Sequence, residues 1–186
     1  MPRPVDDNRL VWIDLEMTGL EPDHDVIVEI ACLVTDNDLN ILDDGIDIVV
    51  HQSETALSVM DEFVVNMHTK SGLILEIAAS TVDLATAGAT TLEYIKQHIP
   101  VAGTTPLCGN SIGTDRRFLV EYLREIDDYL HYRSIDVSSF KELCRRWYPA
   151  EYKGRPGKQE THRALDDIRE SVAEMKYYRE AMLKQG

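Results

Sequence analysis

Basic residues are scarce in this chain. Its 186 residues include 19 lysines and arginines against 33 aspartates and glutamates, which gives a formal net charge of −14. Long nucleic acids are usually held by a stripe of basic side chains that displaces counterions, and the sequence contains no such stripe. The protein therefore either does not bind nucleic acid, or contacts only a few phosphates and recruits cations to do so.

Cysteines and long apolar runs are also few. Cys32, Cys108 and Cys144 lie far apart and form no Cys-x-x-Cys pair, which indicates reduced thiols rather than a disulfide framework or a zinc site. No apolar run approaches the ~20 residues that span a bilayer, and the N-terminus lacks the basic-then-apolar order of a secretory signal. We therefore expect a cytoplasmic protein without a membrane partner, with a single domain over residues 1–186 and a loose arm at residues 1–8.

Apolar runs and turn residues predict a mixed α/β fold. Strands are expected at residues 10–14, 27–34, 46–50, 106–109 and 133–137. Helices are expected at 58–65, 71–79, 83–98, 114–126, 138–147 and 163–184, with Ser138 as the N-cap of the helix at 138–147 and a loop at 152–161. Three strands followed by alternating helices and strands indicate a mixed five-stranded sheet flanked by helices.

Two carboxylates end the first apolar run. Side chains alternate along a strand, so Asp14 and Glu16 project to one face and Leu15 to the other. Neighbouring carboxylates repel each other and resist burial, and a divalent cation such as Mg²⁺ or Mn²⁺ between them removes both obstacles. Acids at a solvated strand end are also common, so this pair alone leaves both interpretations open.

A third acid follows the predicted strand at 106–109. The turn that contains Gly109 and Gly113 delivers Asp115 to the start of a helix. This position suits a metal ligand, but an acid in the first turn of a helix is also favoured by the helix dipole. Asp115 therefore gains meaning only together with the other carboxylates.

A fourth acid lies near the start of the last helix. Its apolar stripe consists of Leu165, Ile168, Val172, Met175 and Met182. At about 100° per residue, Asp166 points nearly opposite to this stripe and Asp167 lies on its flank. We therefore assign Asp167 as the ligand and Asp166 to the solvent.

Three separate segments thus offer four carboxylates to one site. Asp14, Glu16, Asp115 and Asp167 fit a centre with two divalent ions, where one ion activates water and both stabilise a phosphoryl oxygen. His162 precedes the last helix and suits the role of general base on that water. We interpret Glu29 of the second strand as a paired structural acid rather than a fifth ligand.

Three segments resemble the exonuclease motifs of the DEDD superfamily, histidine variant: 14–20 (DLEMTGL), 109–118 (GNSIGTDRRF) and 162–167 (HRALDD). The segments 12–20, 131–133 (HYR) and 141–147 (KELCRRW) resemble the oligoribonuclease family in particular, over nearly the whole chain. The resemblance implies a ribonuclease-H-like fold, two Mg²⁺ or Mn²⁺ ions per site and a homodimer. It also implies 3′-to-5′ exoribonuclease activity that degrades RNAs of two to a few nucleotides to 5′-mononucleotides.

The resemblance assigns roles to further residues. Tyr132, as a catalytic residue, and Arg133 would complete the partner's site across the dimer interface. Ser111, Arg133 and Ser138 match positions that cap the 5′ phosphate of the substrate. A short RNA also agrees with the acidic composition, because two cations and Arg133 can neutralise its few phosphates.

Three other positions are matched to substrate-binding residues of the family. Leu20 matches a residue that packs against a base, and His68 follows the family pattern. Phe63 stands where the family often has a tryptophan wedge, and a phenylalanine can still stack on a base over a smaller area.

Two alternative functions remain open at this point. A 3′-to-5′ deoxyribonuclease of the proofreading type would use the same metal site, although the lack of a basic stripe argues against it. A non-catalytic scaffold with the same fold would bind a partner protein instead, although the intact carboxylates and His162 argue against that role.

Overall fold

The computed structural model describes residues 8–157 and 162–183. The strands are β1 (Arg9–Met17), β2 (Ile27–Asp36), β3 (Ile46–Val49), β4 (Pro106–Gly109) and β5 (His131–Asp136). The helices in these ranges are α1 (Glu54–Leu57), α2 (Glu62–Lys70), α3 (Leu73–Ala79), α4 (Leu84–His98), α5 (Gly113–Tyr122), α6 (Arg124–Tyr129), α7 (Val137–Trp147), α8 (Pro149–Lys153) and α9 (Ala164–Met182).

The sheet has five strands in the order β3-β2-β1-β4-β5. β1 is its central strand, antiparallel to β2 and parallel to β4, and β5 continues the parallel half. The predicted mixed sheet flanked by helices is therefore confirmed. After β3 the chain crosses to the other side of β1, so β1 and β4 flank a topological switch point. In open α/β sheets, ligands bind outside the carboxyl ends of the strands at such a point.

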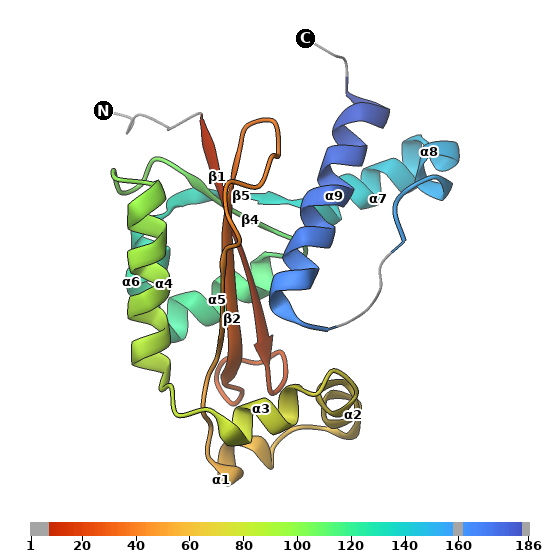
Figure 1. The fold of residues 1–186 in the computed structure, drawn as a ribbon. Coiled ribbons are helices and arrows are strands. Elements are labelled where there is room, and N and C mark those ends of the chain that lie inside the picture. The colour runs from red at the N-terminus through yellow and green to blue at the C-terminus, as the bar shows by residue number, and fades with distance from the viewer. Residues whose placement is uncertain (1–7, 158–161, 184–186) are drawn as a thin grey trace.

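Two layers of helices cover the sheet. In Figure 1, α4 and α6 lie on one side of it and α7 and α9 on the other, while α1, α2 and α3 gather at the end where β1 finishes. Val11, Ile13 and Leu15 of β1 pack into the core under α4, α5 and α6, and Trp12 packs into the core under α7 and α9. Burial of one such side chain contributes about 1.5–3 kcal/mol. By alternation, Asp14 and Glu16 share the face of Trp12, which is the face that α9 covers.

Several helix boundaries differ from the predicted ones. The helix expected at 58–65 begins instead at Glu62, because the Asp61 side chain accepts a hydrogen bond from the Val64 amide and caps α2. The helix expected at 114–126 is divided at Leu123, whose non-helical backbone (φ −135°, ψ 47°) separates α5 from α6. A leucine gives no turn signal, so the sequence could not reveal this break.

The predicted N-cap at Ser138 is wrong. β5 begins at His131, earlier than expected, and α7 begins directly after it at Val137. Asp136 is the N-cap, and its carboxylate accepts a hydrogen bond from the Ser138 amide. Aspartate and serine are comparable N-caps, so the choice depends on where the strand ends.

The two segments predicted to be irregular lie partly outside the described residues. This holds for residues 1–7 of the expected arm and residues 158–161 of the expected loop. The first two residues of that loop, Tyr152 and Lys153, belong to α8. In residues 8–157 and 162–183, no single helix is long and apolar enough to cross a membrane. In the same ranges, α3 and α4 would together be long and apolar enough, but the chain bends sharply between them.

Candidate functional site

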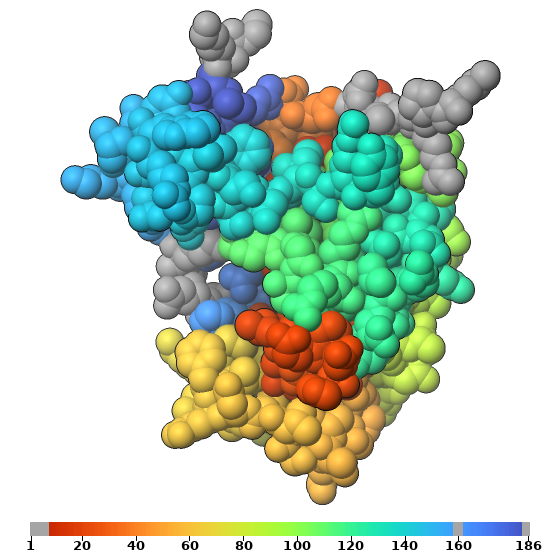
Figure 2. Space-filling view, turned by 180° about the vertical axis from the view of Figure 1, so that it is seen from behind, coloured from red at the N-terminus to blue at the C-terminus, as the bar shows by residue number. Residues whose placement is uncertain are grey.

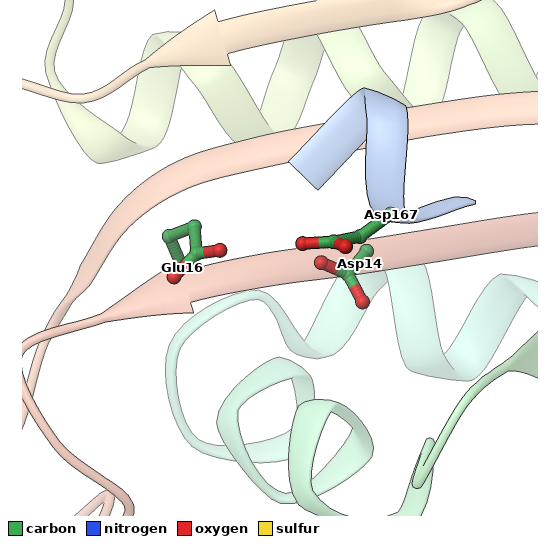
Figure 3. Close-up of side chains that lie close together, drawn as sticks. All are labelled: Asp14, Glu16 and Asp167. Atoms are coloured by element: carbon green, nitrogen blue, oxygen red, sulfur yellow. The ribbon is translucent and has the colours of Figure 1, made fainter. Parts of the chain in front are cut away.

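Three carboxylates converge at the end of β1. Asp14 and Glu16 on β1 and Asp167 in the first turn of α9 each offer an oxygen within 4.8 Å of the others. Figure 3 shows the Asp14 and Asp167 carboxylates pointing toward each other, with Glu16 farther along the strand. Glu16 is buried, and Asp14 and Asp167 are half-buried. Residues that are about 150 positions apart in the sequence thus form one acidic cluster.

The local structure explains why these acids meet. Strand alternation places Asp14 and Glu16 on the face that α9 covers. The buried residues Ile168 and Val172 hold α9 on the sheet, and Asp167 lies beside this stripe. Asp166 is exposed and pairs with Arg169. The structure thus places the two aspartates as the helical geometry predicts, one toward β1 and one toward solvent.

The cluster is electrostatically unfavourable without a cation. Burial, together with the charges of Glu29, Asp167 and Asp115, raises the pKa of Glu16 to about 8, against the lowering effect of Arg163. Hard carboxylate oxygens are the ligands that divalent cations of the Mg²⁺ type prefer. A divalent ion offsets both the burial and the repulsion, so these residues fit a bound metal ion.

Asp115 lies next to this cluster but outside the group of three. It is buried at the start of α5, and its Oδ1 accepts a hydrogen bond of 3.0 Å from the Leu15 amide, between Asp14 and Glu16. Burial raises its pKa to about 7, with a contribution from the charge of Asp136. β4 ends at Gly109 and pairs with β1 only at Val11 and Trp12. The Leu15 amide therefore has no partner on β4, and the Asp115 carboxylate accepts its hydrogen bond instead.

His162 lies in the chain two residues before the start of α9, outside the group of three carboxylates. It is half-buried, and its backbone lies in the left-handed region at φ 50°. Such a conformation in a residue other than glycine costs about 1–3 kcal/mol and persists only where the surroundings impose it. The charge of His162 lowers the pKa of His68, after the larger effect of burial.

His68, which the resemblance assigns to substrate binding, is not open to a substrate in this structure. Its side chain is completely buried in α2, where Nε2 is 2.9 Å from the Met17 carbonyl oxygen and Nδ1 is 3.9 Å from Glu16 Oε2. Burial lowers its pKa, which favours the neutral imidazole. His68 therefore holds α2 against the end of β1 through the Met17 carbonyl oxygen. This role depends on how α2 packs and could not be predicted from the sequence.

An open groove of about 530 Å³ begins at Glu16. Its walls come from the segment that follows β1 and from the segment around α2, which lie side by side in Figure 2 in red-orange and yellow. Leu20 and Phe63 line it and remain 65% and 73% exposed, respectively. Two large apolar side chains thus stand open to solvent beside the acidic cluster.

Ser111 and Ser138 are brought together by a residue that the sequence did not single out. Oδ1 of Asp136 accepts hydrogen bonds of 2.9 Å from the amides of both serines. Ser111 has φ 58°, so this carboxylate also holds a left-handed turn. The only sequence signal for Asp136 is an aspartate between a strand and a helix, which indicates an N-cap and nothing more.

Tyr132 and Arg133 lie on β5, an edge strand of the sheet. Both are exposed, Tyr132 to 74%, and the Arg133 guanidinium lies 5.5 Å from the centre of the Tyr132 ring. Arg116 fixes the backbone here by donating to the carbonyl oxygens of His131 and Tyr132, at 3.1 and 3.0 Å. Arg116 follows Asp115 directly, so α5 connects the acidic cluster with this edge.

This sheet order and the acidic cluster define a class of protein, the exonucleases, which hydrolyse phosphodiester bonds. The Exonuclease family model (RNase_T) matches residues 11–175. The fold is similar to that of exonuclease I from Methylocaldum szegediense, with a TM-score of 0.66 at 20% identity over 95% of this chain and 41% of that one. It is also similar to E. coli exonuclease I in complex with a dA16 oligonucleotide, with a TM-score of 0.68 at 14% identity over 94% of this chain and 41% of that one. The chain thus spans about two fifths of these structures, and the likeness concerns the fold.

Sequence relatives give the particular family. The chain is 60% identical over 173 residues to the oligoribonuclease of Mycobacterium sp. (strain KMS), which covers 93% of this chain and 80% of the relative. It is 58% identical over 172 residues to the oligoribonuclease of Mycobacterium avium (strain 104), which covers 92% of this chain and 80% of the relative. The chain belongs to the oligoribonuclease family of the DEDD exonuclease superfamily.

Proposed function

We propose that this enzyme is a 3′-to-5′ exoribonuclease that degrades RNAs of two to a few nucleotides to 5′-mononucleotides. The observation that carries the proposal is the cluster of Asp14, Glu16 and Asp167 at the mouth of a groove with exposed apolar walls. Carboxylates suit the metal-assisted hydrolysis of a phosphodiester, and apolar side chains suit a nucleobase. The relatives named oligoribonuclease support the choice of substrate.

Two Mg²⁺ or Mn²⁺ ions are the cofactors in this proposal. Asp14, Glu16 and Asp167 would hold them together with Asp115, whose Oδ1 is anchored to β1 by the Leu15 amide. When bound, such ions supply an activated water and stabilise charge on the phosphoryl oxygens. The protein's own contribution is a partly buried set of hard ligands whose repulsion the cations relieve.

His162 is the general base in this proposal. It lies two residues before α9, whose first turn carries Asp167. A base held by a constrained backbone keeps its distance from the water that it deprotonates, which is the geometric condition for proton transfer.

The groove accounts for binding of a base. Leu20 and Phe63 would enclose a nucleobase, and one stack of a base on an aromatic ring contributes about 1–3 kcal/mol. Ser111, Ser138 and Arg133 would cap the 5′ phosphate, with the two serines held by Asp136. A cap at the 5′ end limits the length of the substrate, and the net charge of −14 repels longer RNA.

A homodimer completes the site in this proposal. Tyr132 and Arg133 would act in the site of the partner, Tyr132 as a catalytic residue. Their exposure on the edge strand β5 supports this role, because an edge strand with an exposed aromatic ring is suited to contact a second chain.

A length series tests the proposed function. RNAs of two to seven nucleotides with a 5′ label, and a DNA 20-mer, are incubated with the enzyme in Mn²⁺, and the turnover is measured for each. We expect the fastest turnover for the RNA dinucleotide, and loss of activity in Asp167→Asn and in chelator. Faster cleavage of the DNA would support the proofreading alternative. Full activity of Asp167→Asn would exclude the proposed site, and absence of cleavage with no binding of Mn²⁺ would support the scaffold.

A further inference from the structure

Glu29 is an acid that the proposed reaction does not use. It lies on β2 directly opposite Glu16 in the β1–β2 register, and it is completely buried. Both of its oxygens accept hydrogen bonds from the segment that begins α9. Oε1 accepts from the guanidinium of Arg163, with Nε at 2.9 Å, and Oε2 accepts from the amide of Ala164 at 2.9 Å.

These contacts replace an ordinary helix cap. The first amides of a helix have no partner inside the helix and are usually satisfied by the side chain of the N-cap residue. Arg163, the N-cap of α9, makes no such side-chain bond within the described residues. Glu29 satisfies the Ala164 amide from a neighbouring strand instead, and its negative charge lies where the helix dipole favours it.

Arg163 joins a third element to the same point. Its two terminal nitrogens lie 2.8 and 2.9 Å from the oxygens of Glu76 on α3, in addition to the contact with Glu29. One guanidinium thus ties β2, α3 and the start of α9 together. Its planar donor group is suited to two carboxylates in a way that a lysine is not.

The ligand Asp167 lies one turn after this point. Its amide donates to the Arg163 carbonyl oxygen at 3.0 Å, so the backbone of Arg163 and the position of Asp167 are linked directly. His162 is the residue on the other side of Arg163. We propose that Glu29 and Arg163 are positioning residues, which set the place of Asp167 and His162 against β1. This inference rests on the proposed metal site.

The geometry also argues against a direct role of Glu29 as a metal ligand. Both oxygens already face N–H donors, and the carboxylate belongs to an ion pair with Arg163 at 2.7 Å. The pair supports the cluster in a second way, because Arg163 balances a negative charge that would otherwise stand opposite Glu16. Residues that orient metal ligands typically change metal affinity or activity by about 10–100-fold when they are replaced.

The test compares Glu29→Gln with the matched variant Glu76→Gln. Both remove one carboxylate from the same guanidinium, but Glu76 is exposed to 47% on α3, whereas Glu29 is completely buried and also accepts from the Ala164 amide. Three quantities are measured: kcat and KM on an RNA dinucleotide, the Mn²⁺ concentration at the midpoint of thermal stabilisation, and hydrogen exchange of the backbone amides at 163–168 in the metal-free protein.

For Glu29→Gln we expect kcat to fall and the Mn²⁺ midpoint to rise, each by about tenfold or more, with KM changed by less than about threefold. We also expect faster exchange at 163–168 without metal. Glu76→Gln should stay within about twofold of the wild type. Arg163→Lys keeps the charge but not the planar donor group, so its kcat, Mn²⁺ midpoint and exchange rates should lie between those of Glu29→Gln and the wild type. If Glu29→Gln does not fold, Arg163→Lys serves as the test variant in its place.

Two results would overturn the proposal. The first is that Glu29→Gln has the same amide exchange and the same Mn²⁺ midpoint as the wild type. The second is that Glu29→Gln and Glu76→Gln lose equal amounts of activity and Mn²⁺ affinity. Exchange in the metal-free protein does not depend on catalysis. A failure of the proposed function, seen as full activity of Asp167→Asn, is therefore distinguishable from a failure of this positioning role.

Discussion

Glu16→Gln should stabilise the metal-free protein at alkaline pH although it removes a proposed metal ligand. Burial and the neighbouring acids raise the pKa of Glu16 from its ordinary 4.5 to about 8. The folded protein therefore keeps this proton while the unfolded chain releases it. Glu16 therefore does not affect the free energy of unfolding below pH 4.5, and it lowers this free energy as the pH rises toward 8.

The magnitude follows from this difference in pKa. At about 1.4 kcal/mol for each pH unit, a change from 4.5 to about 8 corresponds to roughly 5 kcal/mol. Relaxation and water entry reduce this figure in a real site, so we expect a gain of about 2–5 kcal/mol for Glu16→Gln at pH 8. For a chain of this size, about 1 kcal/mol corresponds to 2–4 °C in Tm.

The assay is urea denaturation of the wild type and Glu16→Gln in EDTA, at several pH values from 5 to 8. The difference in the free energy of unfolding should be small at pH 5 and grow toward pH 8. Saturating Mn²⁺ should narrow this difference, because a ligand at 100 times its Kd stabilises the wild type by about 2.7 kcal/mol. A difference that does not change with pH, or a wild type that is more stable in EDTA at pH 8, would refute the reasoning.

Three further predictions concern the substrate and the edge strand. Phe63→Ala should raise KM by about 5–150-fold with a smaller change in kcat, measured on an RNA dinucleotide, because it removes a stacking surface that contributes about 1–3 kcal/mol. Arg116→Ala should lower the free energy of unfolding by about 1–3 kcal/mol, since the half-buried ion pair with Asp127 and the contacts with two β5 carbonyl oxygens are lost. Arg117→Ala breaks an exposed pair with Glu21 and a long contact of 3.4 Å with the Leu20 carbonyl oxygen, and it should cost less than about 1 kcal/mol. If Tyr132 acts in the partner's site, mixing Tyr132→Ala with Asp167→Asn should restore activity through mixed dimers, and a mixture as inactive as its parts would argue against that arrangement.

Local patterns were sufficient to predict most of the acidic cluster. The alternation of β1 placed Asp14 and Glu16 on one face, and the apolar stripe of α9 distinguished Asp167 from Asp166. Both patterns are periodic and depend only on residues nearby in the sequence. The strands were predicted for the same reason, since short runs of β-branched and apolar residues are a local signal.

The remaining features depend on contacts that are distant in the sequence. The cap of α9 by Glu29 joins residues 135 positions apart, and a glutamate in the middle of a strand carries no sign of its partner. The burial of His68 follows from the packing of α2 against the end of β1, not from the sequence around it. Asp136 was missed because its second partner, the Ser111 amide, belongs to another turn.

The alignment of Glu16 and Glu29 across the β1–β2 pair has a consequence for the evolution of this chain. Like charges directly opposite each other destabilise a sheet, and here the Arg163 side chain compensates for one of them. Loss of Arg163 alone would leave the buried charge of Glu29 without this counterion, whereas a paired replacement would not. We expect the two positions to covary among homologues, with the loss of arginine at 163 accompanied by an uncharged residue at 29.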